Sequence, residues 1–115
     1  MKNSIQVLAL VGVLMVISAF QMIKTSLGII VRDETGNIVA GASVQLFENE
    51  EDYKSEQNVV AQGVTDEKGF IRLKELKAIS YFVIVRKDDK DNSDGGERTA
   101  KLDEKRMNKV TVIIQ

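Results

Sequence analysis

The side chains best able to do chemistry in this sequence are carboxylates, and they gather in two short segments. The segment Asp88–Gly96 (DDKDNSDGG) offers the oxygen ligands that a hard cation such as Ca²⁺ prefers. Its calcium candidates are Asp89, Asp91 and Asp94. Their spacing does not follow the EF-hand loop, because Asp94 stands where that loop requires glycine. A solvated hairpin loop without metal is the competing interpretation, and it is the one we expect.

The second acidic group is Glu50, Glu51 and Asp52. Neighbouring carboxylates can act as general acid and base when a pocket shifts their pKa values apart. The surrounding segment Glu48–Gln57 (ENEEDYKSEQ) is polar throughout, so it predicts an exposed loop with one helical turn. We therefore expect no catalytic residue here, and a hydrolase remains only a distant alternative.

Composition narrows the function classes further. The chain has 115 residues, which is enough for one small domain, and it contains no His and no Cys. These two absences exclude His-based triads, disulfides, thiolate nucleophiles and most transition-metal sites. The formal net charge of −1 gives no basic patch for nucleic acid. We expect a protein that is not an enzyme and holds no cofactor.

The N-terminal region, residues 1–24, is predicted to be a targeting segment. Its core Val7–Phe20 is uncharged, Lys2 precedes it and Lys24 follows it. Such a pattern is typical of a signal peptide that is cleaved on export. Residues 5–23 also approach the length of about 20 apolar residues that a membrane-spanning helix needs, so an uncleaved anchor is the alternative. Either interpretation places residues 25–115 outside the cytoplasm, in the periplasm or at the cell surface, with a further option of anchoring in the inner membrane.

From Leu27 onward the apolar pattern has a period of two, which is typical of β-strands. Short β-rich runs alternate with turn signals, and this predicts an all-β protein, a seven-stranded antiparallel sandwich. The seven predicted strands are Leu27–Arg32, Ala42–Phe47, Val59–Val64, Phe70–Leu73, Tyr81–Arg86, Arg98–Leu102 and Val110–Ile114. The predicted core is Leu27, Ile29, Val31, Ala42, Val44, Leu46, Ile71, Leu73, Val83, Val85, Leu102, Val110, Val112 and Ile114.

One tight turn connects the third and fourth predicted strands. Asp66 can accept backbone N–H bonds from the residues that follow it, and Gly69 suits a reversal of the chain. We interpret Thr65, Asp66 and Gly69 as structural turn residues rather than as a site.

This pattern of strands and turns resembles the carboxypeptidase regulatory-like domain, a transthyretin-like or prealbumin-like sandwich of small exported bacterial proteins. The matching segments are LGIIVRDETGNIVAGASVQLF, GVTDEKGFIRLKEL and YFVIV. The resemblance covers residues 27–114 and implies a Greek-key topology of seven strands. The resemblance also extends to enzymes of similar fold, hydroxyisourate hydrolases and intradiol dioxygenases. Their chemistry depends on His residues that this chain lacks, so the resemblance does not imply these activities. Related pilin domains form an isopeptide bond from a Lys, and here Arg32 stands near that position.

The residues of opposite parity to the core are candidates for a partner surface. Pairing of the first and last strands would bring Ile30 near Ile113 on one outer face. The second and fifth strands would group Phe47, Phe82 and Ile84 on the other. Grouped apolar residues on an outer face favour an interaction surface, although scattered ones are common on any protein.

These observations predict a non-enzymatic structural or interaction module of the bacterial envelope. Its partner would be a protein or a glycan, and a two-fold homodimer is the simplest closure if the partner is a second copy. A membrane-tethered accessory subunit of an envelope assembly, held by residues 5–23, is the alternative. Membrane contact would then be made through that segment alone.

Overall fold

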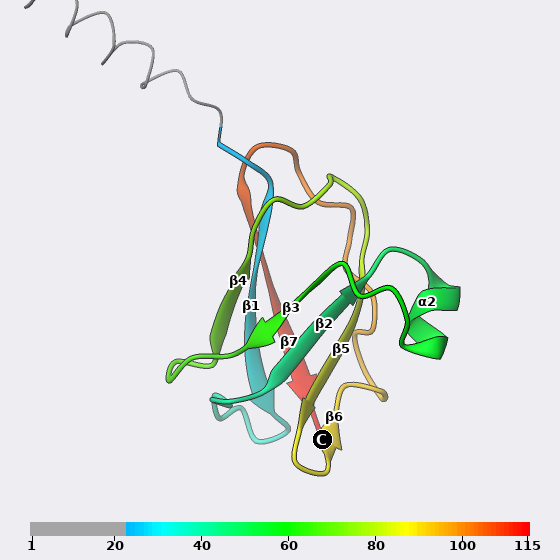
Figure 1. Ribbon diagram of the computed structural model, residues 1–115. Helices are drawn as coiled ribbons and strands as arrows, with labels where there is room; N and C mark the ends of the chain where they lie inside the picture. Colours follow the sequence, from blue (N-terminus) through cyan, green and yellow to red (C-terminus); the bar gives the residue numbers. More distant parts are fainter. Residues whose placement is uncertain (1–22) are drawn as a thin grey trace, which may run out of the picture.

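The computed structural model describes residues 23–115, which form two facing β-sheets (Figure 1). One sheet has the strand order β4-β1-β7 and the other has the order β3-β2-β5-β6. The elements are β1 (Ser26–Asp33), β2 (Ser43–Phe47), α2 (Glu50–Ser55), β3 (Ala61–Val64), β4 (Phe70–Leu73), β5 (Phe82–Lys87), β6 (Lys90–Asp91) and β7 (Met107–Ile114). The predicted all-β class, with seven strands in two sheets, is confirmed.

The pairing of the first and last strands is also confirmed, but its direction corrects the antiparallel expectation. β1 and β7 run parallel over eight residue pairs, with Ile30 opposite Thr111 and Arg32 opposite Ile113. The reason lies in the chain between β5 and β7, because residues 88–106 return to the end where β1 begins. Ile30 and Ile113 therefore share a face as diagonal neighbours rather than as a direct pair.

The core between the sheets contains the predicted residues. Twelve of the fourteen are buried, and the other two, Ile71 and Val110, are partly buried against the same cluster. Tyr81 is an addition, with 1% of its surface exposed. Its hydroxyl accepts a hydrogen bond from the Lys77 N–H at 2.9 Å, so a polar atom in the core is satisfied. Burial is the main cause that raises the pKa of the Tyr81 phenol.

The sixth strand is not where the sequence predicts it. Residues Arg98–Leu102 form no strand, and only Arg98 makes an isolated bridge, to Phe82. The sixth strand is the two-residue β6, inside the segment that we expected to be an exposed loop. It is short because the next residue, Asn92, is buried and bonds the edge of β5 with its side chain. Its amide oxygen accepts from the Val85 N–H at 3.0 Å, and its amide nitrogen donates to the Val83 carbonyl at 2.9 Å.

The structural turn at residues 65–69 is confirmed. The Asp66 carboxylate accepts from the N–H groups of Lys68 and Phe70 at 2.8 and 3.0 Å. The buried Thr65 hydroxyl donates to the Val39 carbonyl and accepts from the Ala42 N–H. Gly69 has a φ of +69°, and a Cβ there would lie 3.0 Å from the Val31 carbonyl oxygen. This turn therefore connects the two sheets and needs glycine at its end.

The predicted targeting segment lies outside the described residues. Within residues 23–115, no helix is both long enough and apolar enough to cross a membrane.

Candidate interaction face

The outer face of the sheet β3-β2-β5-β6 is covered in part by α2, the short helix that follows β2 and packs on β2 and β5 (Figure 1). The Asn49 side chain caps this helix by accepting from the Asp52 N–H at 2.8 Å. Acidic residues fill its first turn, where the helix dipole favours them. The prediction that Phe47, Phe82 and Ile84 form an exposed surface on this face is therefore wrong in part. Phe47 is fully buried and Ile84 is 8% exposed.

Tyr53 is the side chain that makes this cover. Its ring stacks on Phe82 with the centroids 5.3 Å apart and meets Phe47 edge-on at 6.2 Å. The Arg98 guanidinium lies 5.1 Å from the centroid of the Phe82 ring. The Tyr53 hydroxyl donates to the Glu97 carboxylate at 3.0 Å. Burial, followed by that hydrogen bond, raises the pKa of Tyr53. The aromatic part of this second face, around Phe47 and Phe82, is therefore closed by intramolecular contacts, whereas Val64 on β3 is 61% exposed.

The outer face of the sheet β4-β1-β7 has no such cover from the described residues. The strand registers determine which side chains lie on this face. Arg72 and Lys109 lie on either side of Gly28. Phe70 and Thr111 lie on either side of Ile30. We call this surface the open face. It consists of Ile30, Arg32, Phe70, Arg72, Lys109, Thr111 and Ile113. Ile113 is 44% exposed, and Ile30 and Phe70 are half-buried.

Glycine at position 28 allows the Phe70 ring to lie over β1 on the open face. A Cβ at Gly28 would be 2.8 Å from Cε2 of the Phe70 ring, so the ring occupies the space that any other residue would fill. Glycine in a strand often marks such a close approach. The result is an aromatic surface next to Ile30 in the middle of the sheet.

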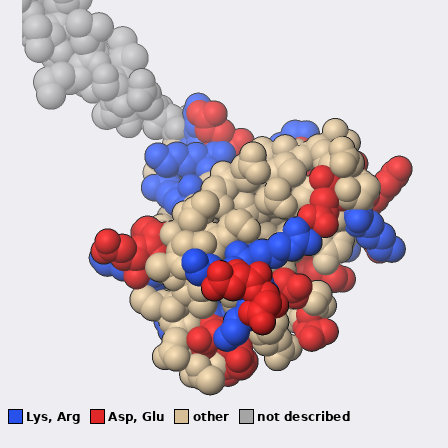
Figure 2. Space-filling view, turned by 60° about the horizontal axis from the view of Figure 1, so that its bottom comes forward, with Lys and Arg blue, Asp and Glu red and all other residues tan. Residues whose placement is uncertain are grey.

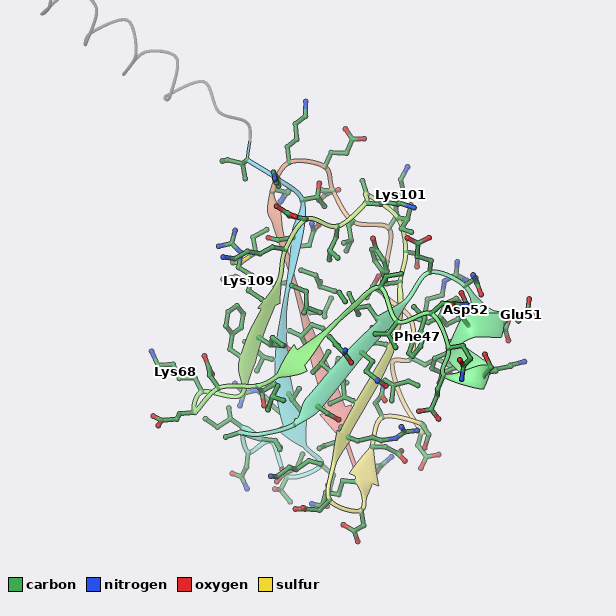
Figure 3. The ribbon with its side chains drawn as sticks, viewed as in Figure 1. Phe47, Glu51, Asp52, Lys68, Lys101 and Lys109 are labelled. Carbon is green, nitrogen blue, oxygen red and sulfur yellow. The ribbon has the colours of Figure 1, made fainter. Side chains whose placement is uncertain are left out.

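The charges of the open face have one sign. It carries Arg32, Arg72 and Lys109, and no carboxylate lies on it in residues 23–115. None of the three cations makes an ion pair within the described chain. Arg32 donates to the Gly36 carbonyl at 2.9 Å, and the Arg72 Nε lies 3.3 Å from the Ser26 hydroxyl. Lys109 projects from the side of the molecule that carries this sheet (Figure 3).

The calcium candidates do not converge. Among the described residues, Asp89, Asp91 and Asp94 belong to no group of three metal-binding side chains. The Asp91 carboxylate instead accepts from the N–H and the hydroxyl of Ser93, at 2.9 and 2.6 Å. These bonds, the hydroxyl first, lower the pKa of Asp91. Glu50 and Glu51 are likewise exposed on α2, and Glu50 pairs with Lys54 at 3.0 Å.

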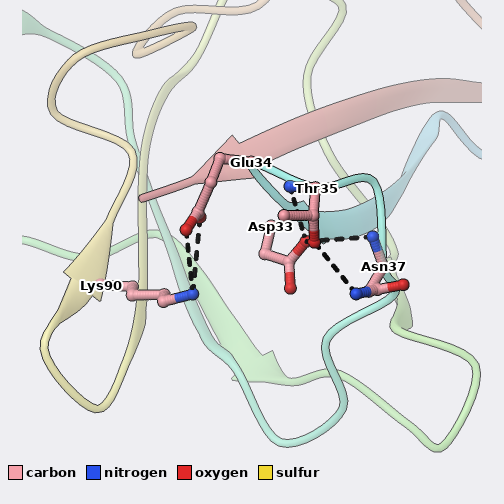
Figure 4. A network of polar contacts seen from close by, with 5 residues as sticks. All are labelled: Asp33, Glu34, Thr35, Asn37 and Lys90. Atoms are coloured by element: carbon pink, nitrogen blue, oxygen red, sulfur yellow. Dashed lines mark hydrogen bonds and ion pairs between the residues drawn. The ribbon is translucent and has the colours of Figure 1, made fainter.

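A hollow of about 300 Å³ lies at the end of the sandwich away from residue 23. Asp33, Asp88 and Lys87 line it, together with apolar residues of the loop that follows Asp33. The Asp33 carboxylate is occupied by its own turn, since it accepts from the Thr35 hydroxyl and the N–H groups of Thr35 and Asn37 (Figure 4). The hydroxyl is the main cause that lowers the pKa of Asp33. We therefore assign this carboxylate to turn structure.

Sequence reasoning identified only two of the seven residues on the open face, Ile30 and Ile113. Arg72 and Lys109 are missing from the prediction because only apolar residues of outer parity were considered, and Phe70 is missing because the fourth strand was not included in that comparison. The signal was available in the alternation of the fourth and last strands, where Arg72 and Lys109 face away from the core. No family model matches the chain, and no curated protein matches it at a significant level.

Proposed function

We propose that this chain is a non-enzymatic, exported interaction module that binds an acidic protein surface at a bacterial envelope through its open face. The observation that carries the proposal is the contrast between the two outer faces. On one face Tyr53 covers Phe47 and Phe82, whereas the other presents apolar side chains among three cations without a compensating carboxylate.

The composition of the open face favours a protein over a glycan as the partner. Aromatic residues and Arg are enriched at protein interfaces, where apolar anchors are surrounded by polar groups. Phe70 and Ile30 supply a central apolar surface, and Arg72 and Lys109 flank it. A sulfated glycan would match the charge but would leave Ile30 and Ile113 without an apolar counterpart. Charge complementarity therefore selects an acidic protein.

The finer description of the fold belongs to the same proposal. We take residues 25–115 as one Greek-key, prealbumin-like domain similar to the carboxypeptidase regulatory-like domain. The two Asx turns at Asp33 and Asp66, and the strand orders of the two sheets, support this similarity. Residues 1–24 are then the segment that exports the domain or retains it at the membrane.

The test is a titration of isotope-labelled protein with a decaglutamate peptide, followed by amide chemical shifts. We expect shifts to concentrate at β1, β4 and β7 and to weaken with added salt. Dextran sulfate serves as the glycan probe. Shifts spread over α2 and β3, or binding of dextran sulfate alone, would contradict the proposed partner.

A further inference from the structure

The charges of the sandwich are divided between its two ends. We define the proximal end as residues 23–25, 74–81 and 99–106, which adjoin the start of the described chain (Figure 1). The distal end is residues 33–41, 65–69 and 87–96. The proximal end holds six cations and three carboxylates, whereas the distal end holds three cations and eight carboxylates. Figure 2 brings the distal end forward, and basic atoms gather beside the point where the described chain begins.

The positive charge of the proximal end is free to meet a partner. Two of its carboxylates are already paired, Glu75 with Lys24 at 2.7 Å and Asp103 with Arg106 at 3.4 Å. Lys74, Lys101 and Lys105 are exposed and make no ion pair within the part of the chain that the structure describes. Lys101 projects outward at this end (Figure 3).

Thr25 holds the start of the domain tightly against the proximal end. It is buried, its carbonyl accepts from the Leu76 N–H at 3.0 Å, and its hydroxyl accepts from the Lys105 N–H at 2.9 Å. In the sequence, the uncharged stretch of residues 5–23 ends directly before Lys24. A single residue thus separates that stretch from the fixed position of Thr25, and one residue spans at most about 3.6 Å. Any bilayer that the stretch enters therefore lies next to the proximal end, the end of the domain whose charges are least screened from it at a Debye length of about 10 Å in 0.1 M salt.

We propose that the proximal end docks on the anionic headgroups of the bilayer that residues 5–23 enter. This inference rests on the membrane-tethered form of the proposed function, in which that segment is retained. The lysines attract anionic lipid, and a tilt that brings the carboxylates of the distal end close to the bilayer is opposed by repulsion. The sandwich therefore stands upright, and its open face extends sideways and outward where a protein partner can reach it. Each lysine near an anionic surface favours the docked state by about fivefold.

The experiment uses the full chain in vesicles, with fluorescent labels at single introduced cysteines. Because the chain has no native Cys, Ala100→Cys and Gly95→Cys give unique labels at the proximal and distal ends. Energy transfer to a lipid-borne acceptor reports the distance of each label from the bilayer. In phosphatidylglycerol vesicles we expect transfer to increase for the proximal label and to decrease for the distal label, relative to phosphatidylcholine. The difference should collapse in 1 M salt, where the Debye length is about 3 Å.

Matched variants separate the lysines of the two ends. A triple variant at the proximal end combines Lys74→Gln, Lys101→Gln and Lys105→Gln. It should abolish the dependence of energy transfer on lipid charge. Lys68→Gln with Lys87→Gln and Lys90→Gln, which removes the same charge from the distal end, should preserve it. Two results would overturn the inference: transfer that is indifferent to lipid charge and salt in the unmodified chain, or an intact mass from native membranes that lacks residues 5–23. Binding of decaglutamate in phosphatidylcholine vesicles tests the open face independently, so failure of one proposal is distinguishable from failure of the other.

Discussion

Phe70 lies over Gly28 on the outer side of β1, with a ring carbon 2.8 Å from the place where a Cβ at residue 28 would be. This contact gives the open face its apolar centre, and it depends on the smallest side chain. We therefore predict that Gly28→Ala displaces the ring without unfolding the domain, because Phe70 is half-buried and has solvent on one side. Changed Phe70 ring resonances, with a melting temperature within a few degrees of the original, would be the expected signature. The double variant Gly28→Ala with Phe70→Leu serves as the control, since the shorter side chain removes the clash. A collapse of stability in Gly28→Ala would contradict this prediction.

Thr65 connects the turn after β3 to the loop before β2. Thr65→Val keeps the shape but leaves the Ala42 N–H and the Val39 carbonyl without their partner. Each buried group left unsatisfied costs about 1–3 kcal/mol, so we expect a loss of about 2–4 kcal/mol of unfolding free energy in urea. Thr65→Ser retains both hydrogen bonds and should lose less than about 1.5 kcal/mol. Equal losses in the two variants would show that the hydroxyl is not the stabilising group.

Tyr53 covers Phe47 and Phe82 on the second outer face. Tyr53→Ala should expose this apolar surface, increase the fluorescence of a hydrophobic dye, and cost about 2–3 kcal/mol of stability. Tyr53→Phe removes only the exposed hydrogen bond to Glu97 and should cost less than about 1 kcal/mol. Dye binding that is the same in all three proteins would mean that α2 does not close this face.

Asp33 predicts a dependence of stability on acid pH. Its folded-state pKa lies below the ordinary value of 3.8, mainly because the Thr35 hydroxyl bonds the carboxylate. A lowered pKa stabilises the fold above 3.8, and that contribution is lost as the pH falls through the folded value. Asp33→Asn lacks the titrating group, so the unmodified protein should be more stable than this variant at pH 6, and the gap should close below pH 3.8. A gap that is constant from pH 6 to pH 2 in urea unfolding would contradict the assignment.

Strands and turns could be predicted from the sequence where the residue types of the segment itself decide its structure. Alternation placed Leu27, Ile29 and Val31 in the core, and the turn chemistry of Asp66 was evident from the residue types. Side chains that take the place of a strand through contacts far along the chain could not be predicted in the same way. Asn92 takes the place of a strand at the edge of β5, and nothing in the polar segment around it marks this role.

The candidate face shows the same limit. Phe47 was expected to be exposed because the alternation of side chains tells which face of a sheet a residue lies on, but not what packs on that face. Phe47 is covered by Tyr53, six residues further along the chain, and this contact depends on the tertiary position of α2. Arg72 and Lys109 were accessible to the same parity argument, but their grouping depends on the parallel pairing of β1 with β7.

The most direct test of the open face compares two double variants that remove equal charge. The dissociation constant for decaglutamate is measured for the unmodified chain, for Arg72→Gln with Lys109→Gln, and for Lys68→Gln with Lys87→Gln. We predict at least a tenfold weakening for the first pair, since about 1.4 kcal/mol corresponds to tenfold in affinity, and a change of less than twofold for the second. Equal weakening in both pairs would show that the peptide responds to net charge alone and would contradict a binding site on this face.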